Sequence, residues 1–212
     1  IQMDESPEQT AGIKVTKTGD LTIEDCNIIR STNALYLAPA SGQAIASVWV
    51  SNCFFDTSAR GLYISATGTV VRCRFTQCWF TSHTNEGIRM QHNGSGFVRG
   101  VTFIGCDVSL NGAGGIVVAT AGVAGVEFLH NAIGGNTGQG IDIAAATNDF
   151  MICNNRIGNS HDVGANTGYG INVNTGASNE YVITGNHLRG NTLGALADNG
   201  TGANKLVANN LT

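Results

Sequence analysis

Charged side chains are scarce in this sequence, and positive charge is the scarcer kind. Asp, Glu, Lys and Arg make up 12% of the 212 residues, and the formal net charge is −4. A nucleic-acid-binding surface needs a stripe of Lys and Arg to meet the phosphates, so we expect no nucleic-acid partner. No uninterrupted apolar stretch approaches the roughly 20 residues of a membrane-spanning helix, so we expect no membrane insertion.

Proline is nearly absent, with 2 residues against 29 glycines. Short runs of Val, Ile and Phe nevertheless recur along the whole chain, which argues against disorder. The sequence begins at Ile1 without a Met and shows no signal peptide, and it ends two residues after a repeat position with no capping segment. We therefore expect a processed chain, a piece of a larger protein or a member of an oligomer.

A repeated hexapeptide organises the sequence. The pattern is apolar-x-x-[Cys/Asn]-x-apolar, as in IEDCNI and FLHNAI, and successive copies are 24 to 31 residues apart. Its fourth residues are Cys26, Cys53, Cys78, Cys106, Asn131, Asn155, Asn186 and Asn210, and the last copy ends in Thr instead of an apolar residue. Since Asn replaces Cys at one position, we expect all six cysteines to be reduced and packed as small apolar groups.

A second pattern, [Gly/Ala]-[Ile/Leu]-x-apolar, keeps the same phase. It begins at Gly12, Ala34, Gly61, Gly87, Gly115, Gly140 and Gly170, and a degenerate copy, ALAD, begins at Ala195. Both patterns alternate with a period of two, which is typical of strands, and turn residues divide each repeat into several short strands. A repeat of this length cannot bury its apolar face alone but can when stacked on its neighbours.

The sequence therefore predicts an all-β solenoid, a single-stranded parallel β-helix of about eight coils over residues 12–212, after a polar lead-in at 1–11. Equivalent residues of successive coils would stack about 4.8 Å apart. The Asn column would form a ladder of side-chain amides, as in other stacked sheets, and the Cys column would fill the same position with apolar contact.

These two patterns resemble those of the right-handed parallel β-helix superfamily, which includes pectate-lyase-like enzymes, alginate epimerases and bacteriophage tailspike proteins. The resemblance covers residues 12–212 and implies a right-handed coil. It is most like a tailspike or tail segment, which implies a trimer. The sequence lacks the family's signatures Arg-x-Pro-x-x-Arg, Asp-Pro-His-Asp and Gly-His-Gly, so any activity rests on fold analogy.

Large side chains recur at the outward positions of the predicted strands. We regard five as carbohydrate-binding candidates: Tyr36, Tyr63, Arg89, Trp49 and Trp79. Aromatic rings can stack on the apolar face of a sugar. They are also enriched at subunit interfaces, and they can be covered by a loop or by the lead-in segment. All three interpretations stay open at this point.

One coil carries an insertion of six residues between Asn155 and Gly170, and the insertion contains His161 and Asp162. Insertions in repeat proteins map to loops, often on the binding face. In the catalytic interpretation, His161 or Asp162 is the acid or base and Asp142 is its partner, while Arg156 neutralises a uronate or a developing charge. In the alternative, the insertion is a solvated glycine-rich loop.

The leading functional hypothesis is a phage-type tail or spike segment that binds a cell-surface polysaccharide, with or without cleavage, on a virion or otherwise extracellular. A stand-alone polysaccharide lyase, glycoside hydrolase or uronate epimerase is the second hypothesis, and a purely structural stalk is the third. No cluster has the spacing of metal ligands, so we expect no metal and no other cofactor.

Overall fold

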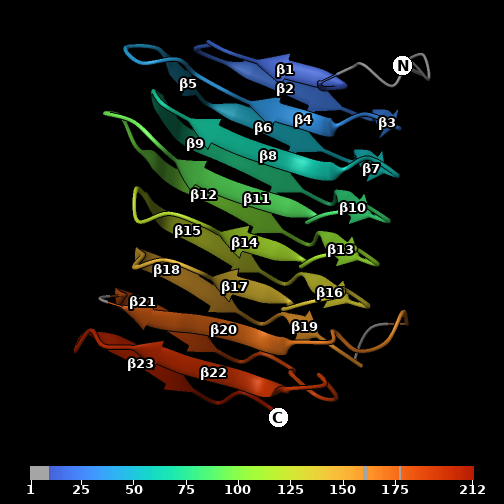
Figure 1. The fold of residues 1–212 in the computed structure, drawn as a ribbon, viewed down its shortest axis with the longest axis vertical. Coiled ribbons are helices and arrows are strands. Elements are labelled where there is room, and N and C mark those ends of the chain that lie inside the picture. Colours follow the sequence, from blue (N-terminus) through green and yellow to red (C-terminus); the bar gives the residue numbers. More distant parts are fainter. Residues whose placement is uncertain (1–9, 160–161, 177) are drawn as a thin grey trace.

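The computed structural model describes residues 10–159, 162–176 and 178–212, and within them the chain forms strands, turns and loops but no helix. The strands stack as successive coils, from β1 at one end to β22 and β23 at the other (Figure 1). All pairs in the three sheets are parallel, and each strand pairs with the equivalent strand of the coil before and after it. The predicted parallel β-helix of about eight coils is confirmed.

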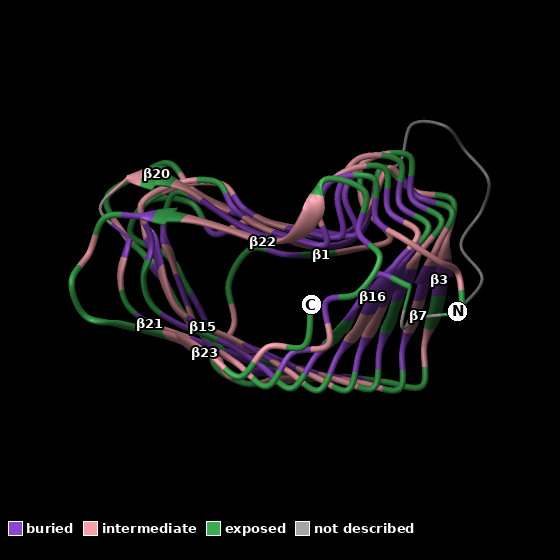
Figure 2. Ribbon diagram, turned by 90° about the horizontal axis from the view of Figure 1, so that it is seen from below, coloured by how far each residue is buried: buried purple, intermediate pink, exposed green. Residues whose placement is uncertain are grey.

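Sheet 1 has eight strands and contains the glycine pattern. Its strands are β1 (Ile13–Val15), β4 (Asn33–Leu37), β8 (Arg60–Ala66), β11 (Ile88–His92), β14 (Ile116–Val118), β17 (Ile141–Ile143), β20 (Tyr169–Gly176) and β22 (Gly194–Gly200). In the view along the stack, β1, β20 and β22 lie on one long side of the coil, which bends inward (Figure 2).

Sheet 2 precedes the Cys/Asn position in each coil. Its strands are β2 (Leu21–Glu24), β6 (Val48–Ser51), β9 (Thr69–Thr76), β12 (Val98–Ile104), β15 (Val123–Leu129), β18 (Asn148–Cys153), β21 (Asn179–Thr184) and β23 (Lys205–Ala208), with β5 (Ala44–Ala46) paired to β9.

Sheet 3 follows the Cys/Asn position and is the shortest. Its strands are β3 (Asn27–Ile29), β7 (Phe54–Asp56), β10 (Trp79–Thr81), β13 (Asp107–Ser109), β16 (Ala132–Gly134) and β19 (Arg156–Ile157).

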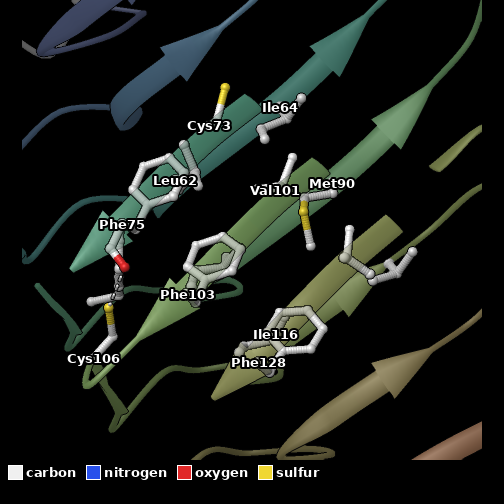
Figure 3. Packing of buried hydrophobic residues seen from close by; sticks show 14 of the residues in the cluster. Leu62, Ile64, Cys73, Phe75, Met90, Val101, Phe103, Cys106, Ile116 and Phe128 are labelled. Carbon is white, nitrogen blue, oxygen red and sulfur yellow. Dashed lines mark hydrogen bonds between the residues drawn. The ribbon is translucent and has the colours of Figure 1, made fainter. Parts of the chain in front are cut away.

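The core consists of columns of like side chains from successive coils. Phe75, Phe103 and Phe128 stack with ring centroids 4.8 and 5.5 Å apart, and Leu62 and Ile116 of sheet 1 lie within the same cluster (Figure 3). All three phenylalanines are fully buried. Stacking in register lets each coil bury an apolar face that it could not bury alone.

The corner between sheets 2 and 3 explains the hexapeptide. The residue before each Cys/Asn position has a left-handed backbone, with φ between 51° and 68°. The first ladder consists of Asn131, Asn155, Asn186 and Asn210. Nδ2 of each ladder residue donates to Oδ1 of the ladder residue in the next coil, at 2.9 to 3.0 Å. The thiols of Cys53, Cys78 and Cys106 donate to backbone carbonyls of the preceding coil. The six cysteines are free, as expected.

A second ladder, not predicted from the sequence, occupies the corner between sheets 3 and 1. Asn111, Asn136, Asn166 and Asn191 are linked Nδ2 to Oδ1 at 2.8 Å. The column continues toward the N-terminus through His83, Ser58 and Ser31. Its members lie five residues after those of the first ladder in six of the seven coils, and that constant offset is the signal that could have found it.

The six-residue insertion does not interrupt the second ladder. In its coil the offset from Asn155 to Asn166 is eleven residues, six more than elsewhere. Asn166 still accepts from Asn136 and donates to Asn191. The described part of the insertion packs on the previous coil, where the N–H of Gly135 donates to the carbonyl of Gly164 at 3.1 Å.

Candidate functional site

A groove of about 410 Å³ lies on the outer face of sheet 1, between β11, β14, β17 and the loops that precede β14 and β17. Its polar walls are formed by Glu86, Arg89, Gln139 and Asp142. Small residues form much of the rest of its lining: Ala113, Gly114, Ala119, Gly138 and Ala144. The groove is a candidate site because it combines open space with converging polar groups.

Sheet register brings the groove residues together. Arg89 pairs with Val117, and Val117 pairs with Asp142, so the arginine and the aspartate lie two coils apart in one outward column. The same column continues to Tyr63 and Tyr36 in the earlier coils. Each position is the third residue of the glycine pattern, which points away from the core because side chains alternate along a strand.

Glu86 is the electrostatic centre of one wall. Its Oε2 accepts from Nε of Arg60 and its Oε1 accepts from an amino group of Arg89, both at 2.7 Å. Burial raises the pKa of Glu86, but hydrogen bonds from its own backbone amide and from the two guanidinium groups outweigh burial, and its pKa lies below the ordinary value. Glu86 therefore stays ionised and holds Arg89 in place through this ion pair.

Asp142 has a different environment. Its Oδ1 accepts from Nδ2 of Asn172 at 2.8 Å and from Nδ2 of Asn174 at 3.0 Å, and neither donor carries a charge. Burial raises the pKa of Asp142, and the bond from Asn172 offsets this only in part. Within the described residues Oδ2 accepts no hydrogen bond, so it is the oxygen that is open to a ligand.

The tyrosine pair extends the column beyond the groove. The rings of Tyr36 and Tyr63 are stacked, with centroids 5.2 Å apart and planes 7° from parallel. Lys14 lies over the ring of Tyr36, and Arg60 lies over the ring of Tyr63. The Tyr63 hydroxyl accepts from Nε2 of Gln91 at 2.7 Å. The pair therefore offers ring edges and hydroxyls to a ligand more readily than ring faces.

The other two carbohydrate-binding candidates lie on other sheets. Trp49 is on β6 of sheet 2 and is 60% exposed, and Trp79 is on β10 of sheet 3 and is 46% exposed, with Phe54 tilted against it. The structure thus distributes the five candidates over three sheets, and only Arg89 borders the groove on sheet 1.

The four catalytic candidates are also not gathered in one place. Asp142 is in the groove, but Arg156 is an exposed residue of β19 in sheet 3. Asp162 is exposed in a turn of the insertion and does not border the groove, and His161 lies outside the described residues. The cation nearest in the column to Asp142 is Arg89, a residue predicted from the sequence to bind carbohydrate.

Among residues 10–159, 162–176 and 178–212, no three His, Cys, Asp or Glu residues are placed to hold a metal ion. Nor does this part of the chain include a helix long and apolar enough to cross a membrane. The polar groups of the groove are suited to a hydroxylated or charged organic ligand, because they combine hydrogen-bond donors, acceptors and one cation.

Comparison with known proteins supports the fold. A family model described as a right handed beta helix region matches residues 6–98, and the coils continue in the same register to β23. The predicted resemblance to the right-handed parallel β-helix superfamily is confirmed. No curated protein matches the sequence.

Two solved structures have the same fold at low identity. One is the periplasmic alginate epimerase AlgG, with a TM-score of 0.58, 14% identity, and coverage of 90% of this chain and 50% of that one. The other is the tailspike protein gp49 from Acinetobacter baumannii bacteriophage Fri1, a capsular polysaccharide depolymerase, with a TM-score of 0.50, 15% identity, and coverage of 95% and 41%. The chain spans half or less of the length of these two proteins.

Proposed function

We propose that this right-handed parallel β-helix protein recognises a polysaccharide along the outer face of sheet 1, as part of a phage-type tail or spike. The observation that carries the proposal is the column from Tyr36 through Arg89 to Asp142, which ends in a groove with converging polar side chains. A linear ligand that lies along the stack would meet one outward residue per coil.

The groove has the chemistry of a sugar site. Asp142 offers a carboxylate oxygen to hydroxyl donors, and Arg89 is a planar donor held in a fixed orientation by Glu86. The small side chains of Ala113 and Gly114 leave room for a sugar ring close to the sheet. A few oriented polar groups in a preformed hollow are what small-ligand specificity requires.

The two structural neighbours are consistent with this proposal. One is an epimerase of alginate and the other is a depolymerase of capsular polysaccharide. Because identity is 14 to 15%, the likeness concerns the fold, and it is the groove of this chain that supplies the argument for a polysaccharide ligand.

Cleavage or epimerisation at the same groove is a second candidate, and Asp142 favours it. Its raised pKa suits an acid or base, and Arg89 could neutralise charge on a uronate. A glycoside hydrolase needs two working carboxylates, whereas Glu86 is occupied by two arginines. The arrangement therefore fits the base-and-cation chemistry of a lyase or epimerase better than hydrolysis. His161, Asp162 and Arg156 remain proposed contributors to this chemistry.

A glycan screen tests the proposal, scored for binding and for release of reducing ends or unsaturated products. Asp142→Asn and Arg89→Gln should each weaken binding about tenfold, since each removes a hydrogen bond to a charged group. Matched controls with the same loss of charge are Asp149→Asn in sheet 2 and Arg189→Gln, both exposed and away from the groove. If the wild-type chain binds no glycan, the purely structural stalk is the hypothesis that remains.

We further propose a trimer located on a virion or otherwise outside the cell, as in the tailspike interpretation. Light scattering of the purified chain gives the molar mass directly. A mass three times the 22.0 kDa of the chain would support the trimer, and a monomer that cleaves glycans would favour the stand-alone enzyme.

A further inference from the structure

A second hollow, of about 470 Å³, lies on sheet 2, which faces away from the sheet 1 groove. It is bordered by Ser47, Trp49, Arg72, Arg74, Gly100 and Thr102. Trp49 pairs with Arg74 across β6 and β9, so the indole and this guanidinium group are neighbours in successive coils. Arg72 is at a left-handed bend within β9, with φ 55°, and is exposed.

The ring of Trp49 is a large outward aromatic that has no partner among the described residues. Tyr36 and Tyr63 stack on each other, Trp79 packs against Phe54, and Arg99 covers the ring of Phe97. Trp49 has no stacking, cation or hydrogen-bond contact in the described part of the chain, although it is 60% exposed. An indole face left open to water is an unsatisfied apolar surface that a ligand can cover.

The two arginines of this hollow are also unpaired. On sheet 1, Arg60 and Arg89 each form an ion pair with Glu86. Arg72 and Arg74 have no carboxylate partner within the described residues, and Glu127, in the same column, instead accepts from Thr102 at 3.0 Å. In a chain of net charge −4, the hollow is therefore a local positive site with two free guanidinium groups.

We infer that the sheet 2 hollow binds an acidic sugar residue, with the apolar face of its ring on Trp49 and its carboxylate or sulfate on Arg72 and Arg74. A guanidinium group binds carboxylates and sulfates through charge-assisted bidentate hydrogen bonds, and the adjacent indole selects a ligand with a flat apolar face. The inference rests on the proposed function in one respect, that the ligand is a polysaccharide. It adds that the polysaccharide is anionic and that a second face of the β-helix binds it.

A nucleic acid is the less suitable ligand for this hollow. Single-stranded binding proteins line a continuous basic groove with successive aromatic platforms, whereas this column changes to Thr102, Glu127 and Met151 immediately after Arg74. One ring and two cations match one charged sugar unit.

The chain has two tryptophans, which makes the test specific. In Trp79→Phe, Trp49 becomes the sole tryptophan, so its fluorescence reports binding at this hollow alone. We would titrate Trp79→Phe with oligomers of galacturonate, glucuronate and mannuronate and with a sulfated galactan oligomer. The methyl-esterified uronates and the unsulfated galactan are uncharged controls. We expect at least one anionic oligomer to change the emission and to bind about tenfold more tightly than its uncharged form.

Two variants in the Trp79→Phe background complete the test. Arg72→Gln with Arg74→Gln should weaken binding of the anionic oligomer by tenfold or more, while Arg99→Gln, an exposed arginine of the same sheet outside the hollow, should leave it unchanged. Thermal melting of each variant verifies the fold. Equal affinity for anionic and uncharged oligomers, no emission change with any anionic oligomer, or tighter binding of a single-stranded oligonucleotide would each overturn the inference.

Comparison of two sets of variants distinguishes failure of this inference from failure of the proposed function. If Asp142→Asn weakens glycan binding and the double arginine variant does not, the sheet 1 proposal stands and the sheet 2 inference is wrong. If the reverse holds, the acidic sugar binds to sheet 2 alone.

Discussion

The backbone N–H of His83 donates to Oδ1 of Asn111 at 3.2 Å, so an imidazole and an amide occupy successive positions of one ladder. On its other side, Nδ1 of His83 accepts the N–H of Ser58 at 3.2 Å, which places the ring proton on Nε2. His83 is 1% exposed, and Nε2 has no partner within the described residues. The ladder thus requires a neutral imidazole in the core.

Protonation of His83 should destabilise the fold. Burial lowers its pKa from 6.5 to about 4, so between these values the unfolded chain binds more protons than the folded one. The contribution of neutral His83 to the free energy of unfolding is therefore fully present above pH 6.5. It is lost as the pH falls toward 4, and the total loss is about 3 kcal/mol. Urea unfolding at several pH values measures this loss.

His83→Asn should keep the ladder and flatten that pH dependence, because an amide does not titrate in this range. His130→Asn is the control, since His130 is exposed. If His83→Asn lost stability between pH 6.5 and 4 as steeply as the wild type, another group would have to be responsible.

Replacing Asn by Cys should cost more inside the first ladder than at its start. Oδ1 of Asn155 accepts both N–H and Nδ2 of Asn131, whereas Oδ1 of Asn131 accepts only the N–H of Cys106. Asn155→Cys leaves one more buried donor without a partner, at a cost of about 1–3 kcal/mol. Equal free energies of unfolding for Asn155→Cys and Asn131→Cys would contradict this account.

Deletion of residues 160–165 should leave the β-helix folded. The deletion restores the five-residue offset between Asn155 and the next member of the second ladder, and it places Asn159 where the preceding coil has Gly135, at φ 66°. Asn tolerates this left-handed backbone. We expect the free energy of unfolding to change by about 1 kcal/mol or less. Loss of glycan cleavage without loss of binding would assign the chemistry to the insertion.

Asp142→Asn should stabilise the protein at neutral pH while it weakens glycan binding. Burial raises the folded-state pKa of Asp142, so ionisation costs folding free energy, and stability is lost as the pH rises through that pKa. An amide oxygen can still accept from Asn172 and Asn174 without this cost. Thermal melting at pH 7 should show a higher midpoint for the variant than for the wild type. A lower midpoint would mean that the charge itself is needed for folding.

The buried thiols of Cys73 and Cys78 should resist modification in the folded protein. Desolvation raises the pKa of Cys73 to about 11, and a hydrogen bond with Cys106, together with burial, raises that of Cys78 to about 12. Since the thiolate is the reactive form, a thiol reagent at pH 8 should label neither residue until the chain unfolds. Labelling mapped by mass spectrometry in native buffer and in urea measures this difference.

The fold could be predicted because its patterns repeat. Each outward column read from the sequence, such as Tyr36 with Tyr63 and Arg89, recurs as strand register, and a column has the same meaning in every coil. The second ladder was missed because Ser31, Ser58, His83 and the later asparagines share a position but not a residue type. The position is defined by hydrogen bonding, and several side chains can supply it.

The site was harder to predict because it depends on neighbours in three dimensions. The sequence predicted Asp142 as a catalytic residue and Arg89 as a carbohydrate-binding residue. It placed Arg156 in the same catalytic site as Asp142, but Arg156 lies on another sheet. In a solenoid, residues one coil apart are closer than residues on the next sheet of the same coil, so the partners of Asp142 come from β11 and β20.

The left-handed corner before each first-ladder residue lets a whole coil be added or removed without changing how the other coils stack. Because every corner has nearly the same backbone conformation, removing or duplicating a whole coil between two such corners preserves the stacking on either side. Each added coil would lengthen the outer face of each sheet by about 4.8 Å, the spacing of adjacent strands. Under the proposed function, the number of coils therefore sets the length of linear polymer that the outer face of sheet 1 can contact, whereas the few outward residues of each coil set its chemical preference.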